Sequence, residues 1–476
     1  MRHQSRSEHR IMMLFPFIIL FLGGLFHLHA LPNHDVAWFA WGARAWLNGA
    51  VIGRDLTDPN FPLGYMLYAP AIGLSYFMSF TQAINTYVLL LTAAVITLSW
   101  HDVPTQTRLP LFSVLAFFIG FSWPREFAQR EELVMLLVFP YIVPDQRQGW
   151  RAIVTGVMAG IGFAVKPFFL IPWILIEINR RPFRPEQLAL MATGALYAVS
   201  LPLFFPTFLF HLLPLTTKVY GAFNRPSDLF HVALRPSVLA IMLWLVAWKM
   251  RNGLALAFAL ATIGFDIAAI AQMKFYSYQF LPTCGYMVLG SVAVICSGKI
   301  SFRLIAWLLL LLTSIPQIKP AHLWYIDSEK KAAQSPLFLK KLQEEGAHSF
   351  SVIGVHPYPA FPTAVIAMEH KIDFTGTASS YWFLPAAAQG NRRAVTLAQQ
   401  QLLTDLSHRP DVIIVDTNWR RHTVISHDFN GLKLLLQDPQ AAREWKNYSP
   451  DGSIDNFVFY KRTSIDTTRR PRSGMQ

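Results

Sequence analysis

Long apolar segments follow one another through the first 318 residues of this chain, and they constrain its fold more than any other feature. They lie near residues 11–30, 64–80, 84–100, 109–122, 132–144, 151–178, 186–205, 236–249, 253–271, 280–297 and 302–318. A helix that crosses a bilayer needs about 20 such residues. Charged residues make up only 14% of the chain, against about 25% in an ordinary soluble domain. The sequence therefore predicts a polytopic α-helical membrane protein.

The formal net charge of +13 does not indicate a nucleic-acid-binding protein. Lys and Arg are not gathered in one stripe but recur in the short connections between apolar segments. That distribution is typical of the positive-inside rule of membrane proteins. We therefore expect a lipid bilayer, and no nucleic acid, as the partner of this surface. Cys284 and Cys296 lie in one apolar segment, which argues against a disulfide between them.

Two adjustments place the basic connections on one side of the membrane. The segment 64–80 is interrupted at Pro70, and we expect it to be a juxtamembrane element that does not cross. The segment 151–178 should divide at Lys166-Pro167, because proline breaks a helix and the lysine needs a polar outlet. About eleven crossings then result, with the C-terminal part outside. The basic residues on the cytoplasmic side are Arg108, Arg147, Arg151, Arg180, Arg181, Arg184, Lys249, Arg251, Lys299 and Arg303.

The composition changes after residue 318, where the chain becomes charged and rich in turn residues. Strand-like runs alternate there with helical patterns, which favours a small α/β domain outside the membrane. The strand-like runs are 351–355, 412–415 and 457–460, and the helical patterns lie near 334–345 and 392–408.

Asp35 follows directly after the first apolar segment, at the expected non-cytoplasmic lip of the helix bundle. A carboxylate there could act as a general base toward an acceptor hydroxyl. It could also ligate a divalent cation. The structural alternative is a cap or turn residue, which is common after a sequence such as Pro-Asn-His.

A second polar constellation spans residues 123–132, the expected outer connection between two crossings. Arg130 could grip a phosphate with two hydrogen bonds. Glu131 or Glu132 could complete a metal site or orient the arginine. The alternative is a solvated loop with internal ion pairs. However, Glu132 directly precedes an apolar run, and a carboxylate that faces lipid there is unfavourable.

Two lysines on the expected outer face could bind a lipid phosphate. Lys166 interrupts an apolar run, so it must face a cavity, pair with a carboxylate or snorkel to the surface. Lys274 precedes Tyr276 and Tyr278, whose rings could stack on a sugar. The alternative for this second stretch is an interfacial aromatic belt.

With these residues, the chain resembles the GT-C superfamily of integral-membrane glycosyltransferases, in particular the protein mannosyltransferase and lipid A aminoarabinose transferase branches. The similarity covers roughly residues 10–180. The motifs that carry it are His34-Asp35, Leu47-Asn48-Gly49, Arg54-Asp55, the stretch from Pro59 to Pro62, Gln129-Arg130-Glu131-Glu132-Leu133, and the run from Gly160 to Pro167.

The resemblance implies a role for several of these residues. Asp35 corresponds to the catalytic carboxylate of the first outer loop. Glu131 or Glu132 corresponds to a second acidic site, where Arg-Glu-Glu stands in place of an Asp-x-Asp, so the need for a divalent cation stays open. From their charge and expected position on the outer face, and not from the resemblance, Arg130, Lys166 and Lys274 are expected to bind the donor phosphate. The supporting residues would be His34, Arg54, Asp55, Asp58, Tyr276 and Tyr278.

The apolar segments, the distribution of charge and the resemblance together predict an architecture and an activity. Residues 1–318 would form the transmembrane domain, with outer catalytic loops at 31–63 and 123–131, and residues 319–476 a periplasmic α/β domain. The protein would reside in the bacterial inner membrane. It would move a sugar from a polyprenyl-phosphate donor to a glycolipid or envelope glycan acceptor, with inversion of configuration. The alternatives are a transporter or flippase for a lipid-linked glycan, and a non-catalytic envelope assembly protein.

Overall fold

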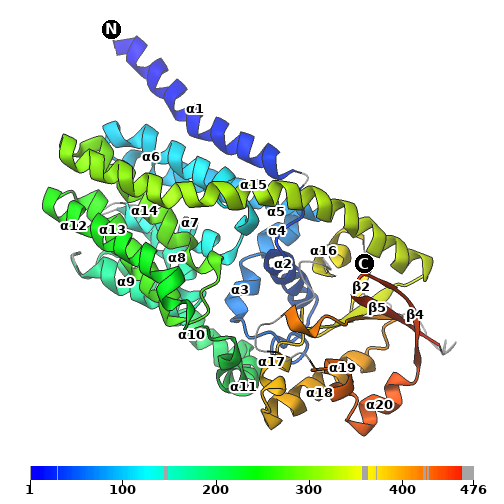
Figure 1. Cartoon of the computed structure of the whole chain (residues 1–476). Coiled ribbons are helices and arrows are strands. Elements are labelled where there is room, and N and C mark those ends of the chain that lie inside the picture. The colour runs from blue at the N-terminus through cyan, green and yellow to red at the C-terminus, as the bar shows by residue number, and fades with distance from the viewer. Residues whose placement is uncertain are drawn as a thin grey trace. The chain divides into compact units, whose positions relative to one another are not determined.

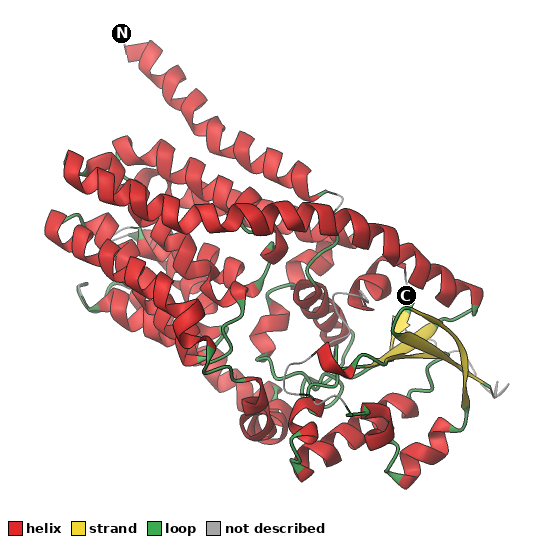
Figure 2. Cartoon of the chain, in the orientation of Figure 1, coloured by secondary structure: helices red, strands yellow, loops and turns green. Residues whose placement is uncertain are grey.

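The computed structural model describes residues 2–28, 30–143, 148–178, 180–355, 363–370, 372–421, 425 and 428–463. Most of these residues are helical, and the strands form one sheet in the C-terminal part (Figure 2). The chain divides into two compact units. We call residues 1–33, 73–200 and 224–328 the helical unit, and residues 34–72, 201–223 and 329–476 the sheet unit. Arg147, one of the expected cytoplasmic residues, lies outside the described residues.

The helical unit consists of long helices joined by short connections (Figure 1). Helices α10 and α15 begin in this unit and end in the other. Its elements are α1 (Arg2–His27), α5 (Phe80–Ser99), η1 (Trp100–Asp102), α6 (Thr105–Phe117), η2 (Phe118–Ser122), η3 (Pro124–Glu126), α7 (Arg130–Ile142), α8 (Gly149–Ala164), η4 (Pro167–Phe169), α9 (Leu170–Glu177), α10 (Pro185–Phe204), η7 (Leu229–Ala233), α12 (Leu234–Met250), α13 (Gly253–Ala271), η8 (Ser277–Phe280), α14 (Leu281–Ser297) and α15 (Ile300–Glu344).

Six helical stretches are long and apolar enough to cross a membrane, and each coincides with an apolar segment of the sequence. This finding is compatible with a multi-pass membrane protein, whereas the count of about eleven crossings stays a prediction. The six stretches are Phe80–Asp102, Pro185–Phe204, Leu229–Met250, Gly253–Ala271, Ser277–Ser297 and Ile300–Leu323.

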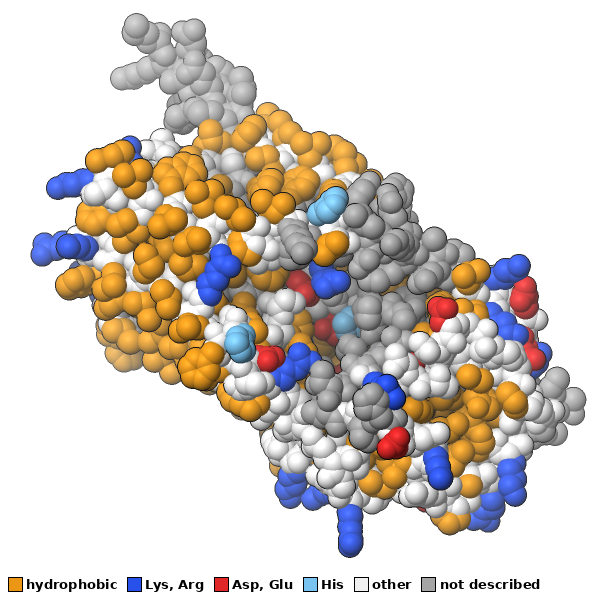
Figure 3. Space-filling model, viewed as in Figure 1, with side chains coloured by type: hydrophobic (Ala, Val, Ile, Leu, Met, Phe, Trp, Pro, Cys, Tyr) orange, Lys and Arg blue, Asp and Glu red, His pale blue; other side chains and the backbone are white. Residues whose placement is uncertain are grey.

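The outward surface of these helices is apolar. Figure 3 shows hydrophobic side chains over most of the visible face of the helical unit, with Lys and Arg side chains at one end of it. An exposed apolar surface of this extent needs lipid or a partner to cover it. Exposed members on α10 and α12 include Leu196, Val199, Leu203, Phe204, Val238, Ile241 and Trp248.

Both expected interruptions of the apolar pattern are present. Two short helices, α3 (Pro62–Met66) and α4 (Ala69–Leu74), occupy most of the segment 64–80, and neither is long enough to cross a bilayer. The segment 151–178 is divided between α8 and α9, with Lys166 in an extended conformation between them. Because Pro167 lacks an N–H group, the first helix cannot continue through it.

Helix α7 is the core of the helical unit. All 13 of its residues are buried, and α5, α8 and α14 pack around it. Gly162 of α8 permits one of these close contacts, because a Cβ atom there would lie 2.8 Å from the Val138 side chain. A helix that is apolar on every side is stable only when it is enclosed. The acidic residues at the start of α7 are therefore held inside the protein.

The sheet unit contains a five-stranded sheet with the order β2-β1-β3-β5-β4. Strands β1, β2 and β3 are parallel, while β5 runs antiparallel to both β3 and β4. The three strand-like runs of the sequence thus form β1, β3 and β5. The elements of the unit are α2 (His34–Leu47), α3, α4, η5 (Phe208–Leu212), α11 (Leu213–Val219), η6 (Tyr220–Phe223), β1 (Ser349–Ile353), α16 (Thr363–His370), β2 (Asp373–Phe374), α17 (Leu384–Ala388), α18 (Arg392–Ser407), β3 (Val412–Asp416), η9 (Trp419–Arg421), α19 (Gly431–Leu435), α20 (Pro439–Trp445), β4 (Tyr448–Ile454) and β5 (Phe457–Arg462).

The aromatic stretch after the first apolar segment forms α2, which packs within the sheet unit. The rings of Trp38 and Trp41 stack on each other at 4.8 Å. Both rings also make edge contacts with Phe374 of β2. This burial of aromatic surface explains why α2 is fixed to residues more than 300 positions later in the chain.

Candidate functional site

The structure distributes the predicted site residues over both units. The donor-binding and second acidic candidates lie in the helical unit, and the candidate base with most supporting residues lies in the sheet unit. Those in the helical unit are Arg130, Glu131, Glu132, Lys166, Lys274, Tyr276 and Tyr278, and those in the sheet unit are His34, Asp35, Arg54, Asp55 and Asp58.

The first turn of α7 brings three charged residues into the interior. Arg130, Glu131 and Glu132 are all buried, and the two carboxylates lie at the helix end where the backbone dipole favours negative charge. The turn before the helix is tight, with Ala128 at a φ of 63°. The Glu132 carboxylate accepts a hydrogen bond from the N–H of Ala128 at 2.6 Å. Glu132 therefore stabilises the helix start, in the manner of a cap.

Glu131 has a different partner. Its Oε1 atom accepts a hydrogen bond from the Lys166 ammonium group at 2.5 Å. Lys166 also donates to the amide oxygen of Gln272 at 3.0 Å, and that oxygen accepts a second bond from Gln279 at 3.1 Å. Of the three alternatives expected for Lys166, a cavity, a carboxylate pair or snorkelling, the structure shows the pair with a carboxylate.

Aromatic rings line the same ammonium group. Lys166 Nζ lies 5.7 Å from the centre of the Tyr278 ring, a distance at which a cation is attracted by the ring face. Tyr276 stacks on Tyr278 with ring centres 5.6 Å apart. The guanidinium group of Arg225 lies 5.5 Å from the Tyr276 ring. The two tyrosines thus lie between two cations.

Lys274 is buried between residues with an unusual backbone. Met273 and Phe275 have φ values of 55° and 54°, a region that side chains other than glycine rarely adopt. The Lys274 ammonium donates to Asn224 Oδ1 at 2.6 Å. Burial lowers the pKa of Lys274 to about 8. Phe275 packs in an apolar cluster whose other members are Ala233, Ala269 and Phe280.

A further group of polar residues ties the end of α1 to this network. Glu126 accepts a hydrogen bond from Ser277 at 2.5 Å. Asn33 donates to the backbone oxygen of Arg125 at 2.8 Å and accepts from Gln129 at 3.0 Å. Gln129 was noted only as part of the motif 129–133, and sequence reasoning missed Asn33 and Ser277 as members. Their only signal was a polar side chain at the edge of an apolar segment, which is common in any membrane protein.

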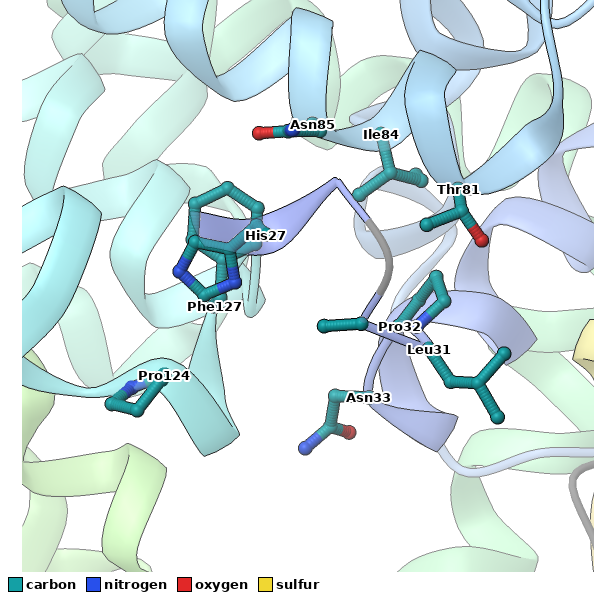
Figure 4. A pocket seen from close by; sticks show the side chains of 10 residues that line it. His27, Leu31, Pro32, Asn33, Thr81, Ile84, Asn85, Pro124 and Phe127 are labelled. Atoms are coloured by element: carbon teal, nitrogen blue, oxygen red, sulfur yellow. The ribbon is translucent and has the colours of Figure 1, made fainter. Parts of the chain in front are cut away.

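A small pocket of about 20 Å³ lies beside these residues (Figure 4). The His27 ring stacks on Phe127, with centres 3.9 Å apart, and its Nε2 atom lies 3.1 Å from the backbone oxygen of Gly120. Asn33 and Pro124 also contribute to the wall. A volume of this size accommodates about one water molecule, so the pocket is too small to hold a sugar.

The candidate base occupies the start of α2 in the sheet unit. Asp35 Oδ1 lies 3.0 Å from His34 Nε2, and both side chains are about a quarter exposed. The residues from Val36 to Ala43 are buried, so the helix that carries Asp35 is firmly held. An accessible carboxylate on a fixed helix has the freedom that a general base needs.

The supporting acidic residues of the sheet unit organise a turn. Arg54 binds both oxygens of Asp55 at 2.8 Å, and Asp55 also accepts from the N–H of Val51. The hydrogen bond from Arg54 lowers the pKa of Asp55. Asp58 accepts a bond from the N–H of Asn60 at 3.1 Å. These contacts are those of turn residues, and they hold the chain that follows α2.

The helical unit therefore contains an anion-binding type of chemistry. Lys166 and Lys274 of this unit donate to the amide oxygens of Gln272 and Asn224, and Arg130 is a third buried cation. Cationic side chains of this kind suit a phosphate. Within the part of the chain that the structure describes, no group of three or more His, Cys, Asp and Glu side chains could hold a metal ion. Comparison with known protein families finds no matching family, and no curated protein is similar in sequence.

Proposed function

We propose that this chain is an integral-membrane glycosyltransferase that takes a sugar from a polyprenyl-phosphate donor. The observation that supports the proposal is the Lys166 environment. The Lys166 ammonium group lies beside the Tyr278 ring, the Gln272 amide oxygen and the Glu131 carboxylate, in a unit whose outward face is apolar. Such a unit could hold the donor's tail against its apolar face and its phosphate near Lys166, Arg130 and Lys274.

The reaction would be a single displacement. The acceptor hydroxyl attacks the anomeric carbon, the bond from that carbon to the phosphate oxygen breaks, and polyprenyl phosphate leaves with the bonding electron pair. Asp35 takes the proton of the hydroxyl. Attack opposite to the leaving group inverts the configuration. Fixed cations stabilise the charge that develops on the phosphate, which is the kind of preorganised electrostatics that accelerates many reactions.

The remaining parts of the proposal concern the acceptor and the location. The sheet unit, which carries Asp35, would hold the acceptor, either a lipopolysaccharide sugar or another glycolipid. The protein would lie in the bacterial inner membrane with about eleven crossings, and the sheet unit would face the periplasm. A phosphatase or reporter fused after residue 476 tests the location, because each reporter is active on only one side.

The test of activity is mass spectrometry of cell-envelope glycolipids from four strains. They are a deletion strain and strains carrying the wild-type chain, Asp35→Asn or Asp373→Asn. Asp373 is an exposed aspartate of β2 and provides the matched control. We expect loss of one sugar mass in the deletion and in Asp35→Asn, and a wild-type pattern in Asp373→Asn.

Two other results would contradict the proposal. If Asp35→Asn restores the sugar at a wild-type level of folded protein, the catalytic role of Asp35 is wrong. If the deletion instead accumulates the lipid-linked sugar on the cytoplasmic side, the protein is a flippase and not a transferase.

A further inference from the structure

The Glu131–Lys166 pair leaves half of a buried carboxylate unused. Glu131 Oε1 binds Lys166, while its Oε2 atom has no hydrogen-bond partner among the described residues. The Glu131 side chain is only 1% exposed, so bulk water does not solvate this oxygen. A buried ion pair is stable only when additional hydrogen bonds satisfy its remaining atoms. Glu131 therefore satisfies its lysine with one oxygen while its other oxygen stays unsatisfied among the described residues.

The accessibility of the two partners differs. The Lys166 side chain is 13% exposed, against 1% for Glu131, so the lysine is the partner of this pair that reaches the surface. Lys166 also lies between α8 and η4, where it has an extended backbone conformation at the N-cap of η4. Lys166 also donates a hydrogen bond to the neutral amide oxygen of Gln272. Replacement of the carboxylate by another anion would leave that contact intact.

A second buried pair in the same unit shows what a permanent ion pair looks like. Glu186 binds Arg184 at 2.9 Å and also has one oxygen without a partner among the described residues. However, Arg184 is only 4% exposed and is held in addition by Glu177 and Tyr141. An anion cannot reach that guanidinium group without breaking several bonds. The two pairs therefore share their chemistry but differ in access to the cation.

We propose that Glu131 is a built-in counter-ion that the phosphate of a lipid displaces from Lys166. The identity of the phosphate as that of a polyprenyl carrier rests on the proposed function, whereas the exchange does not. A buried lysine without a counter-charge is unfavourable, so the site keeps one anion at all times. When the phosphate leaves, Glu131 returns to Lys166 and replaces it.

This exchange has a functional consequence. Competition from Glu131 weakens the binding of any phosphate, including that of the lipid product. A site without this competition would bind product tightly and release it slowly. Glu131 thus sets the affinity of the site, and Glu132, whose carboxylate caps the helix start through Ala128, does not.

The test measures the binding of farnesyl phosphate to the full chain in detergent micelles. The variants are Glu131→Gln, Lys166→Met and the double variant. Glu186→Gln is the matched control, because it makes the same change in the other buried pair of the unit. We expect Glu131→Gln to bind about tenfold more tightly than wild type, in the range of close charge pairs at interfaces. Lys166→Met should bind weakly, with no gain from Glu131→Gln in its background, and Glu186→Gln should bind as wild type does.

A second variant guards against loss of folding. Glu131→Asp keeps the charge but shortens the side chain, so it should bind farnesyl phosphate with an affinity between those of wild type and Glu131→Gln. Unchanged or weaker binding in both Glu131 variants overturns the proposal, as does an equal gain in Glu186→Gln.

The source of the phosphate is distinguished with phosphatidylglycerol in the same assay. If Glu131→Gln gains affinity for farnesyl phosphate alone, the natural occupant is a polyprenyl phosphate. If it gains affinity equally for phosphatidylglycerol, Lys166 exchanges Glu131 with the phosphate of bulk membrane lipid. The binding assay does not involve sugar transfer. If Glu131→Gln binds farnesyl phosphate more tightly but the deletion strain keeps a wild-type glycolipid pattern, the exchange at Lys166 stands and the glycosyltransferase proposal is refuted.

Discussion

The coupling between Glu131 and Lys166 can be measured independently of any function. The perturbation is a double-mutant cycle with Glu131→Gln, Lys166→Met and both changes together. At about 4 Å, two unit charges attract with about 4 kcal/mol when the effective dielectric constant is near 20. The two atoms lie 2.5 Å apart and both side chains are largely buried, so the pair lies in this regime.

Each single variant leaves one buried charge without its partner. We expect each to lower the free energy of unfolding by about 3–5 kcal/mol. The double variant removes both charges and replaces them with neutral groups of similar size. The double variant should therefore lose less unfolding free energy than the two single variants together, and the difference is a coupling energy of about 2–4 kcal/mol.

The assay is reversible unfolding of the full chain in mixed detergent micelles, followed by tryptophan fluorescence. The same cycle with Glu186→Gln and Arg184→Met calibrates it on the second buried pair. If the decreases in the free energy of unfolding of the two single variants sum to that of the double variant within about 0.5 kcal/mol, the two charges do not interact. That result would refute the reasoning behind both the pair and the exchange.

Two further predictions concern stability. Burial raises the pKa of Asp405 to about 6 from an ordinary 3.8, so the folded state holds this proton more tightly and stability should fall by about 3 kcal/mol as pH rises from about 4 to about 6. In Asp405→Asn, the free energy of unfolding measured between about pH 4 and about pH 6 should no longer show this decrease. An unchanged pH dependence in the variant would contradict the role of Asp405. Gly264→Ala places a Cβ atom 2.3 Å from Pro172 Cα, whereas Gly194→Ala meets nothing within 4 Å. In thermal unfolding, Gly264→Ala should lower the free energy of unfolding by about 1–3 kcal/mol, whereas Gly194→Ala should raise it by about 0.5–1 kcal/mol. Equal effects of the two variants would argue against a tight contact between α9 and α13.

The sequence predicted those parts of the fold that depend on local pattern. Apolar length located the six helical stretches that are long enough to cross a membrane, and the alternation of strand-like runs with helical patterns located β1, β3 and β5. The break at Lys166-Pro167 followed from a proline next to a lysine that needs a polar outlet, whereas Pro140 and Pro202 lie inside continuous helices. In contrast, the enclosure of α7 on all sides could not be read from an apolar run, because a lipid-facing helix has the same composition.

The site was predictable only in part, for a geometrical reason. The charged residues of 130–132 and Lys166 stood out against their apolar surroundings. However, successive residues of a helix point about 100° apart, so neighbouring glutamates meet different partners. Glu131 meets Lys166 and Glu132 meets Ala128, and this distinction depends on how α7 and α8 pack. Likewise, the packing of Trp38 and Trp41 on Phe374 depends on residues far along the chain.

The length of α7 sets the depth of its charged end. Thirteen residues span about 20 Å at 1.5 Å per residue, whereas the hydrocarbon core of a bilayer is about 30 Å thick. Arg180 binds the last carbonyl groups of α7, Tyr141 O and Ile142 O, and so ties that end to a guanidinium group that favours a membrane surface. In a bilayer, the other end would then stop about 10 Å short of the opposite surface. A lipid headgroup bound to Lys166 would have to sink below its neighbours, and the local thickness of the membrane would control how easily it does so.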